Sequence, residues 1–124
     1  MGSYLKTYVL DTNSLIYALN DQVKIPLNHY LVSVITEIEL LSYSKLTKPE
    51  DAMIRAMLNQ FEGITLTEKI KNRTISIRKR SKLKLPDSII VATAIEFNAT
   101  LITSDKQLLN LDIVNSIELK SLIK

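Results

Sequence analysis

The stretch of sequence that decides the fold runs from residue 85 to residue 98 and reads LPDSIIVATAIEFN. Between Ser88 and Ile95 it carries no charge on any side. Pro86 and Asp87 are typical of a helix start, so we predict a helix from there to Asn98. A helix that is apolar all round is buried on every side, and its small Ala residues suit close packing against a sheet.

Short apolar runs and helical spacings alternate along the rest of the chain. Strands are predicted at Thr7–Leu10, Tyr30–Val34, Ile64–Leu66, Thr100–Thr103 and within Ile113–Leu122. The other helices are predicted at Thr12–Leu19, at about Thr36–Leu46, from Pro49 to before Gly63, over the basic segment to about Leu83, and after Asp105. This order favours an α/β fold with a parallel sheet of four to five strands and helices on both faces.

The length and composition of the chain are typical of a single globular domain. Its 124 residues suit a single domain over 1–124, and 46% hydrophobic with 23% charged residues is unlike a disordered chain. With no cysteine, a disulfide scaffold, a thiolate zinc site and a cysteine nucleophile are excluded. No apolar stretch approaches the length of a membrane span, and no secretory signal is present, so we expect a cytoplasmic protein.

The charge of the chain is unevenly distributed. Between Glu68 and Pro86 there are eight bases and one acid, whereas the rest of the chain has eight bases and twelve acids. A basic stripe beside an acidic body suggests binding of a polyanion. The bases nearest Asp87 in the sequence, which we consider candidate contacts to a polyanion, are Arg78, Lys79, Arg80, Lys82 and Lys84. A charge run of this kind is also typical of a solvated helix face.

Four acids from distant parts of the sequence are predicted at one edge of the sheet. In an open parallel sheet, ligands bind outside the carboxyl ends of the strands. Asp11 ends the first predicted strand, Asp105 follows the fourth, and Glu39 lies one turn into the helix after the second. Asp87 opens the apolar helix. Each acid also has a structural explanation, because Asp is a favoured N-cap and Thr36-x-x-Glu39 matches a capping box. Capping gives no reason for all four to share one edge.

Electrostatics determines what such an acidic edge requires. Two carboxylates ~4 Å apart repel by about 4 kcal/mol at an effective dielectric constant of 20. Either protons or a hard cation must compensate. All-oxygen ligation without Cys or a nearby His indicates Mg²⁺ or Mn²⁺, which also bind phosphate oxygens. The acidic edge and the basic stripe are then complementary, one for cleaving a phosphodiester and one for holding the polyanion.

Four fragments give the chain a family resemblance. They are Val9-Leu10-Asp11-Thr12-Asn13, Ser33-Val34-Ile35-Thr36-Glu37-Ile38-Glu39-Leu40, the segment from Leu85 to Ala94, and Leu101-Ile102-Thr103-Ser104-Asp105. With these fragments in this order the sequence resembles the PIN-domain ribonucleases, and among them the small VapC-type toxins of toxin–antitoxin pairs. The resemblance covers nearly the whole chain. It implies a PIN-like three-layer α/β/α sandwich.

The resemblance also implies an activity and a site. Asp11 and Asp87 would be direct ligands of a first Mg²⁺, and Glu39 and Asp105 would complete the site through water or a second ion. Asn13 and Thr103 stand where the family has polar residues that orient these carboxylates. The implied reaction is hydrolysis of single-stranded RNA. The implied partners are a second copy of the chain, in a homodimer, and a cognate antitoxin that silences the site.

Other classes of protein fit less well. A phosphatase of the haloacid dehalogenase type needs Asp-x-Asp, and Asn13 occupies the second position. A response-regulator receiver needs adjacent acids after the first strand, where Leu10 and Thr12 flank Asp11. The alternative that stays open is a PIN-like domain without catalysis that binds RNA or a protein.

Overall fold

A five-stranded parallel sheet forms the centre of the computed structural model, which describes residues 5–123. Its strands lie in the order β3-β2-β1-β4-β5. The elements in chain order are β1 (Thr7–Leu10), α1 (Thr12–Asn20), β2 (His29–Ser33), α2 (Val34–Leu41), α3 (Lys48–Leu58), β3 (Glu62–Ile64), α4 (Glu68–Arg80), α5 (Leu85–Glu96), β4 (Thr100–Ile102), α6 (Lys106–Leu109), β5 (Ser116–Ile117) and α7 (Leu119–Leu122). The predicted parallel α/β sheet is thus confirmed.

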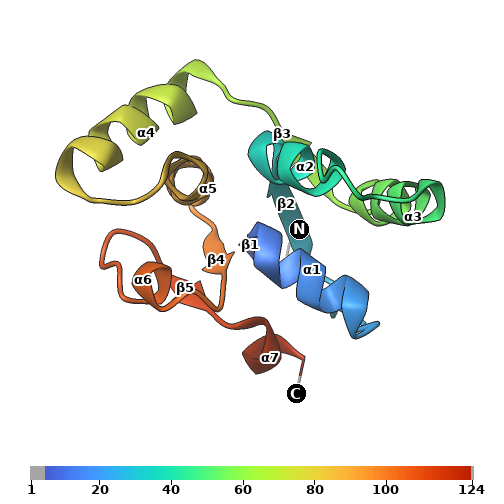
Figure 1. The fold of residues 1–124 in the computed structure, drawn as a ribbon. Coiled ribbons are helices and arrows are strands. Elements are labelled where there is room, and N and C mark those ends of the chain that lie inside the picture. Colours follow the sequence, from blue (N-terminus) through green and yellow to red (C-terminus); the bar gives the residue numbers. More distant parts are fainter. Residues whose placement is uncertain (1–4, 124) are drawn as a thin grey trace.

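Helices cover both faces of the sheet and make the fold a three-layer α/β/α sandwich. One apolar cluster joins the sheet to α4, α5 and α6, and the other joins it to α1, α2, α3 and α7 (Figure 1). Successive side chains of a strand point to opposite faces, so β1 contributes side chains to both clusters. Val9 lies in the first cluster, whereas Tyr8 and Leu10 lie in the second.

Helix α5 is the most buried helix, as its uncharged sequence predicts. All seven residues from Ser88 to Ala94 are buried. The two hydroxyls among them are satisfied within the helix, since Ser88 donates to the Lys84 carbonyl at 2.9 Å and Thr93 donates to the Ile89 carbonyl at 2.8 Å. Buried hydroxyls with such partners do not carry the penalty of an unpaired polar group. The helix can therefore lie between the sheet and α4.

Strand register places the carboxyl ends of β1, β2 and β4 side by side. Leu10 pairs with Ile102, and the Asp11 amide donates to the Ile102 carbonyl at 3.1 Å. Val9 pairs with Leu31 on the other side, and β2 runs directly into α2. Residues that follow these three strands therefore meet at one edge of the sheet, which we call the acidic edge, after Asp11, Glu39, Asp87 and Asp105.

Several predicted boundaries differ from the structure. The strand predicted within Ile113–Leu122 is only Ser116–Ile117, and α7 follows it. Leu119 and Leu122 both pack on the α1 side of the sheet, which requires the three-residue spacing of a helix. The strand predicted at Ile64–Leu66 is Glu62–Ile64, because Leu66 is 49% exposed and gains nothing from a sheet position.

The helix predicted at Thr36–Leu46 is Val34–Leu41. It begins earlier because the Ser33 side chain already caps it, accepting from the Ile35 amide at 3.2 Å. Thr36 is therefore inside the helix, fully buried, and the capping box predicted for Thr36 and Glu39 is wrong.

No helix in the stretch 5–123 is both long enough and apolar enough to span a bilayer.

Enlarging a small residue of α5 tests how tightly this helix is packed. Ala92→Leu forces extra methylenes into a fully buried position and should lower the free energy of unfolding by about 1–3 kcal/mol. Ala56→Leu, the same change at an exposed position of α3, should stay within about 0.5 kcal/mol of wild type. Urea denaturation of both variants measures the difference. Equal effects would mean that α5 has free space around it.

Candidate functional site

The acidic edge brings together side chains that follow different strands. Asp11 comes directly after β1, Asp105 follows β4, and Glu39 lies in the second turn of α2, which continues β2. Asp87 lies in the first turn of α5. The charges of the other three acids all act on Asp87, which places each of their carboxylates within electrostatic reach of Asp87.

Asp11 is held by the backbone around it. It is buried, with 5% exposure, and is the N-cap of α1, where its Oδ1 accepts from the Ser14 amide at 2.8 Å. The Ser14 hydroxyl donates to the Ile102 carbonyl at 3.2 Å, the same carbonyl that accepts the Asp11 amide. The prediction that Asp11 is an N-cap is confirmed. Capping uses only one oxygen, so Oδ2 is left for another ligand.

Asp105 follows the same pattern at β4. It is the N-cap of α6, and its Oδ1 accepts from the Gln107 and Leu108 amides at 2.8 and 3.3 Å. Its own amide donates to the hydroxyl oxygen of the fully buried Thr103 at 3.0 Å. Thr103 thus fixes the turn in which Asp105 lies, and the second carboxylate oxygen is again left over.

Glu39 is hydrogen-bonded to Thr12, the residue that follows Asp11. The Thr12 hydroxyl donates to Glu39 Oε1 at 2.6 Å, and its oxygen lies 3.1 Å from the hydroxyl oxygen of buried Thr36. A hydrogen bond to a carboxylate is stronger than one between neutral groups. Glu39 is exposed, so without this bond its long side chain would be free to rotate. The contact holds it over the end of β1.

Asp87 is the acid whose protonation the site perturbs. Burial raises the pKa of the Asp87 carboxyl above its ordinary value of 3.8, and the neighbouring charges raise it further. In decreasing order of effect these neighbours are Asp105, Asp11 and Glu39, and Lys84 acts in the opposite direction. Asp87 is not the N-cap predicted for it. Lys84 occupies that position, because the helix begins at Leu85 and Asp87 is its third residue.

The sequence analysis did not predict some of the polar residues that hold the carboxylates in place. Thr12, Ser14 and Thr36 make the contacts that fix Asp11 and Glu39, yet none was a candidate. Position could have indicated Ser14, since the third residue after an N-cap supplies the capped amide. Nothing in the sequence indicated that Thr12 reaches α2. Asn13 is exposed, and the hydrogen bond to Glu39 comes from the neighbouring Thr12.

The donor set fits a hydrated hard cation. In the part of the chain that the structure describes, no three acidic or His side chains are arranged to hold one metal ion between them. Mg²⁺ does not need such a cage, because it is usually held by one or two carboxylates and keeps several waters. The oxygens left free on Asp11 and Asp105 and the destabilised charge of Asp87 match this mode of binding. The arrangement does not match a site in which all four side chains bind one ion directly.

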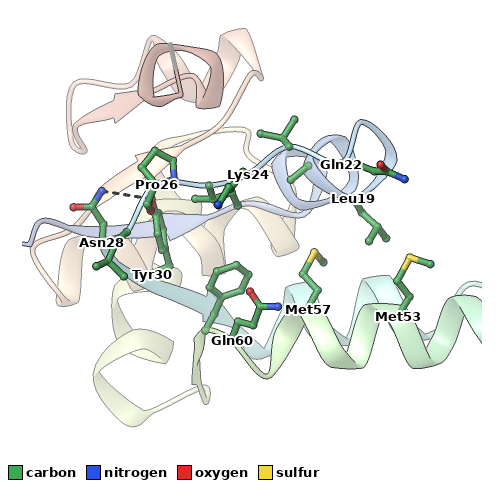
Figure 2. Close-up of a pocket in the computed structure, with 14 residues that line it drawn as sticks. Leu19, Gln22, Lys24, Pro26, Asn28, Tyr30, Met53, Met57 and Gln60 are labelled. Carbon is green, nitrogen blue, oxygen red and sulfur yellow. Dashed lines mark hydrogen bonds between the residues drawn. The ribbon is translucent and has the colours of Figure 1, made fainter.

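One groove of the molecule lies away from the acids. A groove of about 540 Å³ lies between the end of α1, the loop before β2 and α3. In Figure 2, Met53 and Met57 face Leu19 across it, and Tyr30 closes one end. Its loop residues precede β2 and β3, so the groove lies at the amino ends of the strands. Its size therefore does not make it the site of the acids' chemistry.

The predicted basic residues lie at the end of α4 and in the segment that leads to α5, and of these Lys84 acts on the charge of Asp87. Helix α4 ends with Arg78, Lys79 and Arg80, and Lys84 immediately precedes α5. All of the five candidate bases are exposed, and the ion pairs found within residues 5–123 involve none of them. Cations in a last helical turn also stabilise the helix dipole. Their charge nevertheless stays available to an anion.

Removing the charge of Asp87 tests whether its burial and the neighbouring acids destabilise the folded chain. The raised pKa of Asp87 means that the folded chain holds this proton more tightly than the unfolded chain. The resulting penalty is absent below about pH 3.8, grows as the pH rises through the folded pKa, and is complete above it. Asp87→Asn should therefore raise Tm at pH 7 in EDTA, and the gain should shrink towards pH 4.

Differential scanning calorimetry of wild type and variant at each pH measures this gain. Asp112→Asn, an exposed change in the loop after α6, is the matched control and should leave Tm nearly unchanged. A lower Tm for Asp87→Asn at pH 7 would contradict a destabilised charge at Asp87 and indicate a purely structural carboxylate.

Comparisons with known structures give the same fold. The chain is similar to VapBC2 from Rickettsia felis, solved bound to a promoter DNA fragment, with a TM-score of 0.78 and 23% identity over 90% of this chain and 98% of that one. It is similar to a toxin–antitoxin complex from Klebsiella pneumoniae, with a TM-score of 0.73 and 29% identity over 86% and 94%. For VapBC-1 from nontypeable Haemophilus influenzae the values are 0.75 and 21% over 92% and 98%.

The sequence itself identifies the family. No curated protein sequence matches the chain significantly. A family model, that of the PIN domain, matches residues 8–114 and so includes all four acids. Since this match spans most of the 124 residues, the chain belongs to the PIN-domain family.

Proposed function

We propose that this protein is an Mg²⁺-dependent endoribonuclease that hydrolyses phosphodiester bonds of single-stranded RNA. The observation that carries the proposal is the convergence of four acids at one edge: burial raises the pKa of Asp87, and the charges of Asp105, Asp11 and Glu39 raise it further. A fold does not maintain such repulsion for stability alone, and perturbed groups of this kind gather at functional sites. Membership of the PIN-domain family supports the same reading.

Each acid has a part in this proposal. Asp11 and Asp87 would hold a first Mg²⁺ or Mn²⁺, and Glu39 and Asp105 would complete the site through water or a second ion. Such an ion, when bound, lowers the pKa of a water and stabilises negative charge on a phosphoryl group. Asn13 and Thr103 would orient the carboxylates, and Thr12 would hold Glu39 in place through its bond of 2.6 Å.

The chain's own residues would also position the RNA. Arg78, Lys79, Arg80, Lys82 and Lys84 are exposed at the end of α4 and before α5, and would bind phosphates of the strand. Asp11 and Asp105 are fixed by their helix caps, so the free oxygens would stay in place without ordering at the moment of binding. Preorganisation of this kind lowers the barrier of a positioned reaction.

We also propose a biological role, the toxin of a toxin–antitoxin pair. Similar chains occur in VapBC complexes and in a toxin–antitoxin complex from Klebsiella pneumoniae. The partner would be a cognate antitoxin that covers the acidic edge. The chain would act in the cytoplasm as a homodimer, and each copy would be a single PIN-like domain.

One observation favours a second candidate. Since no three side chains among residues 5–123 are arranged to hold one ion, the domain would be a binding module if a metal fails to assemble there. Such a protein would bind RNA or a partner protein without cleaving. The two candidates differ in a single measurable property, metal-dependent cleavage.

Cleavage of a labelled single-stranded RNA with Mg²⁺ or with EDTA tests the proposal. Asp11→Asn keeps the N-cap, because Asn caps as well as Asp, but it removes the charge. Cleavage should need the metal and should fall about 100-fold or more in this variant. The control Asp112→Asn should cleave at the wild-type rate. Equal cleavage in EDTA would remove the metal mechanism, and binding without any cleavage would favour the binding module.

Reversing the charge at the end of α4 tests the RNA contacts. Replacing Arg78, Lys79 and Arg80 by Glu should weaken RNA binding. It should also make the slope of log affinity against log salt concentration shallower by roughly 0.7 per lost phosphate contact. Fluorescence anisotropy at several salt concentrations gives the slope. The charge-matched control replaces Lys6, Lys45 and Lys48, exposed cations on other elements. An equal slope in both triple variants would make the α4 bases solvated surface.

A further inference from the structure

A second hollow lies at the same edge of the sheet as the acids. It has a volume of about 230 Å³ and is lined by Ser14, Tyr17, Ser104, Glu118, Leu119 and Lys120. These residues follow the carboxyl ends of β1, β4 and β5. Ser14 is the residue whose amide binds Asp11, and Ser104 directly precedes Asp105. The hollow therefore shares a wall with the acidic edge and is close to any phosphate held there.

Tyr17 gives this hollow an aromatic wall. It lies one turn after Ser14 on the same face of α1, it is 43% exposed, and it belongs to neither apolar cluster of the described chain. Packing of the core therefore does not explain an aromatic residue here. Unpaired RNA bases stack on exposed aromatic side chains of this kind.

Glu118 and Lys120 provide polar groups at the other wall. The Glu118 carboxylate, 35% exposed, lies 3.4 Å from the Lys120 ammonium, which is 75% exposed. Glu118 is the N-cap residue of α7, but its side chain makes no capping bond, so helix formation does not occupy it. A carboxylate accepts hydrogen bonds and donates none. Because the Lys120 ammonium is exposed, a phosphate can compete with Glu118 for it.

The chemistry of this wall discriminates between bases. Guanine carries two adjacent donors on its Watson–Crick edge, the N1 hydrogen and the N2 amino group, which match the two oxygens of one carboxylate. Uracil offers a single N–H between two carbonyl acceptors, which a carboxylate repels. Adenine and cytosine each offer one amino group beside an acceptor. Of the four bases, guanine thus offers a single carboxylate the best match.

We propose that the hollow between α1 and α7 binds one unpaired nucleobase, with guanine preferred, next to the phosphate at the acidic edge. Tyr17 stacks on the base, Glu118 accepts from its N1 and N2 hydrogens, and Lys120 contacts the adjoining phosphate. This inference rests on the proposed function, since it assigns the substrate's base preference. Cleavage at the acidic edge would then depend on which base lies next to the phosphate that is cut.

Binding of short labelled RNAs by the full chain tests the subsite without cleavage. All proteins carry Asp11→Asn, and the probes are oligouridylates with one central guanosine, inosine or uridine. Fluorescence anisotropy should show tighter binding of the guanosine probe than of the inosine probe, which lacks the N2 amino group. Tyr17→Ala should weaken binding of the guanosine probe about 5- to 100-fold, whereas Tyr17→Phe should retain it. Glu118→Gln should remove the preference for guanosine over inosine.

Tyr43→Ala is the matched control, because Tyr43 is 61% exposed but lies just after α2, outside the hollow. Equal affinity for the three probes, or equal effects of Tyr17→Ala and Tyr43→Ala, would overturn the proposal. Cleavage by the wild-type chain is measured separately on the guanosine probe. Metal-dependent cleavage without guanosine preference rejects only the subsite. Guanosine preference without cleavage supports the subsite and rejects the nuclease.

Discussion

The parallel pairing of β1 with both β2 and β4 is the constraint on which the candidate site depends. Because all three strands end at one edge, the residues that follow them meet there although they are far apart in the sequence. The Ile102 carbonyl secures this edge, since it accepts both the Asp11 amide and the Ser14 hydroxyl. A change in register would separate the carboxylates even if every helix were retained.

Structural and chemical roles are combined in the same side chains at this edge. Asp11 and Asp105 each use one oxygen to cap a helix and leave the other free. The capping explanation and the functional explanation of these acids are therefore compatible. Asp87 differs, because it caps nothing and has the perturbed pKa. The fold thus fixes two carboxylates rigidly and places the unstable charge of a third beside them.

The sequence was sufficient for the layers of the fold and for the position of the acids. The uncharged run of α5 predicts burial, and a parallel sheet sends Asp11, Glu39 and Asp105 to one edge. It was not sufficient for the bond from Thr12 to Glu39, because the separation of α1 and α2 depends on side-chain packing. It also failed at α7, where Leu119 and Leu122 suit a strand or a helix until their common packing partner is known. Thr36 and Glu39 matched a capping box by spacing alone, while Ser33 was the real cap.

Manganese anomalous scattering from a crystal of the full chain soaked in Mn²⁺ tests the central claim most directly. The account predicts a peak of anomalous density at the acidic edge, in contact with the carboxylates of Asp11 and Asp87, that disappears in Asp87→Asn. No peak there, with Mn²⁺ bound elsewhere or not at all, would contradict it. Those carboxylates would then be parts of the scaffold, without a shared ion.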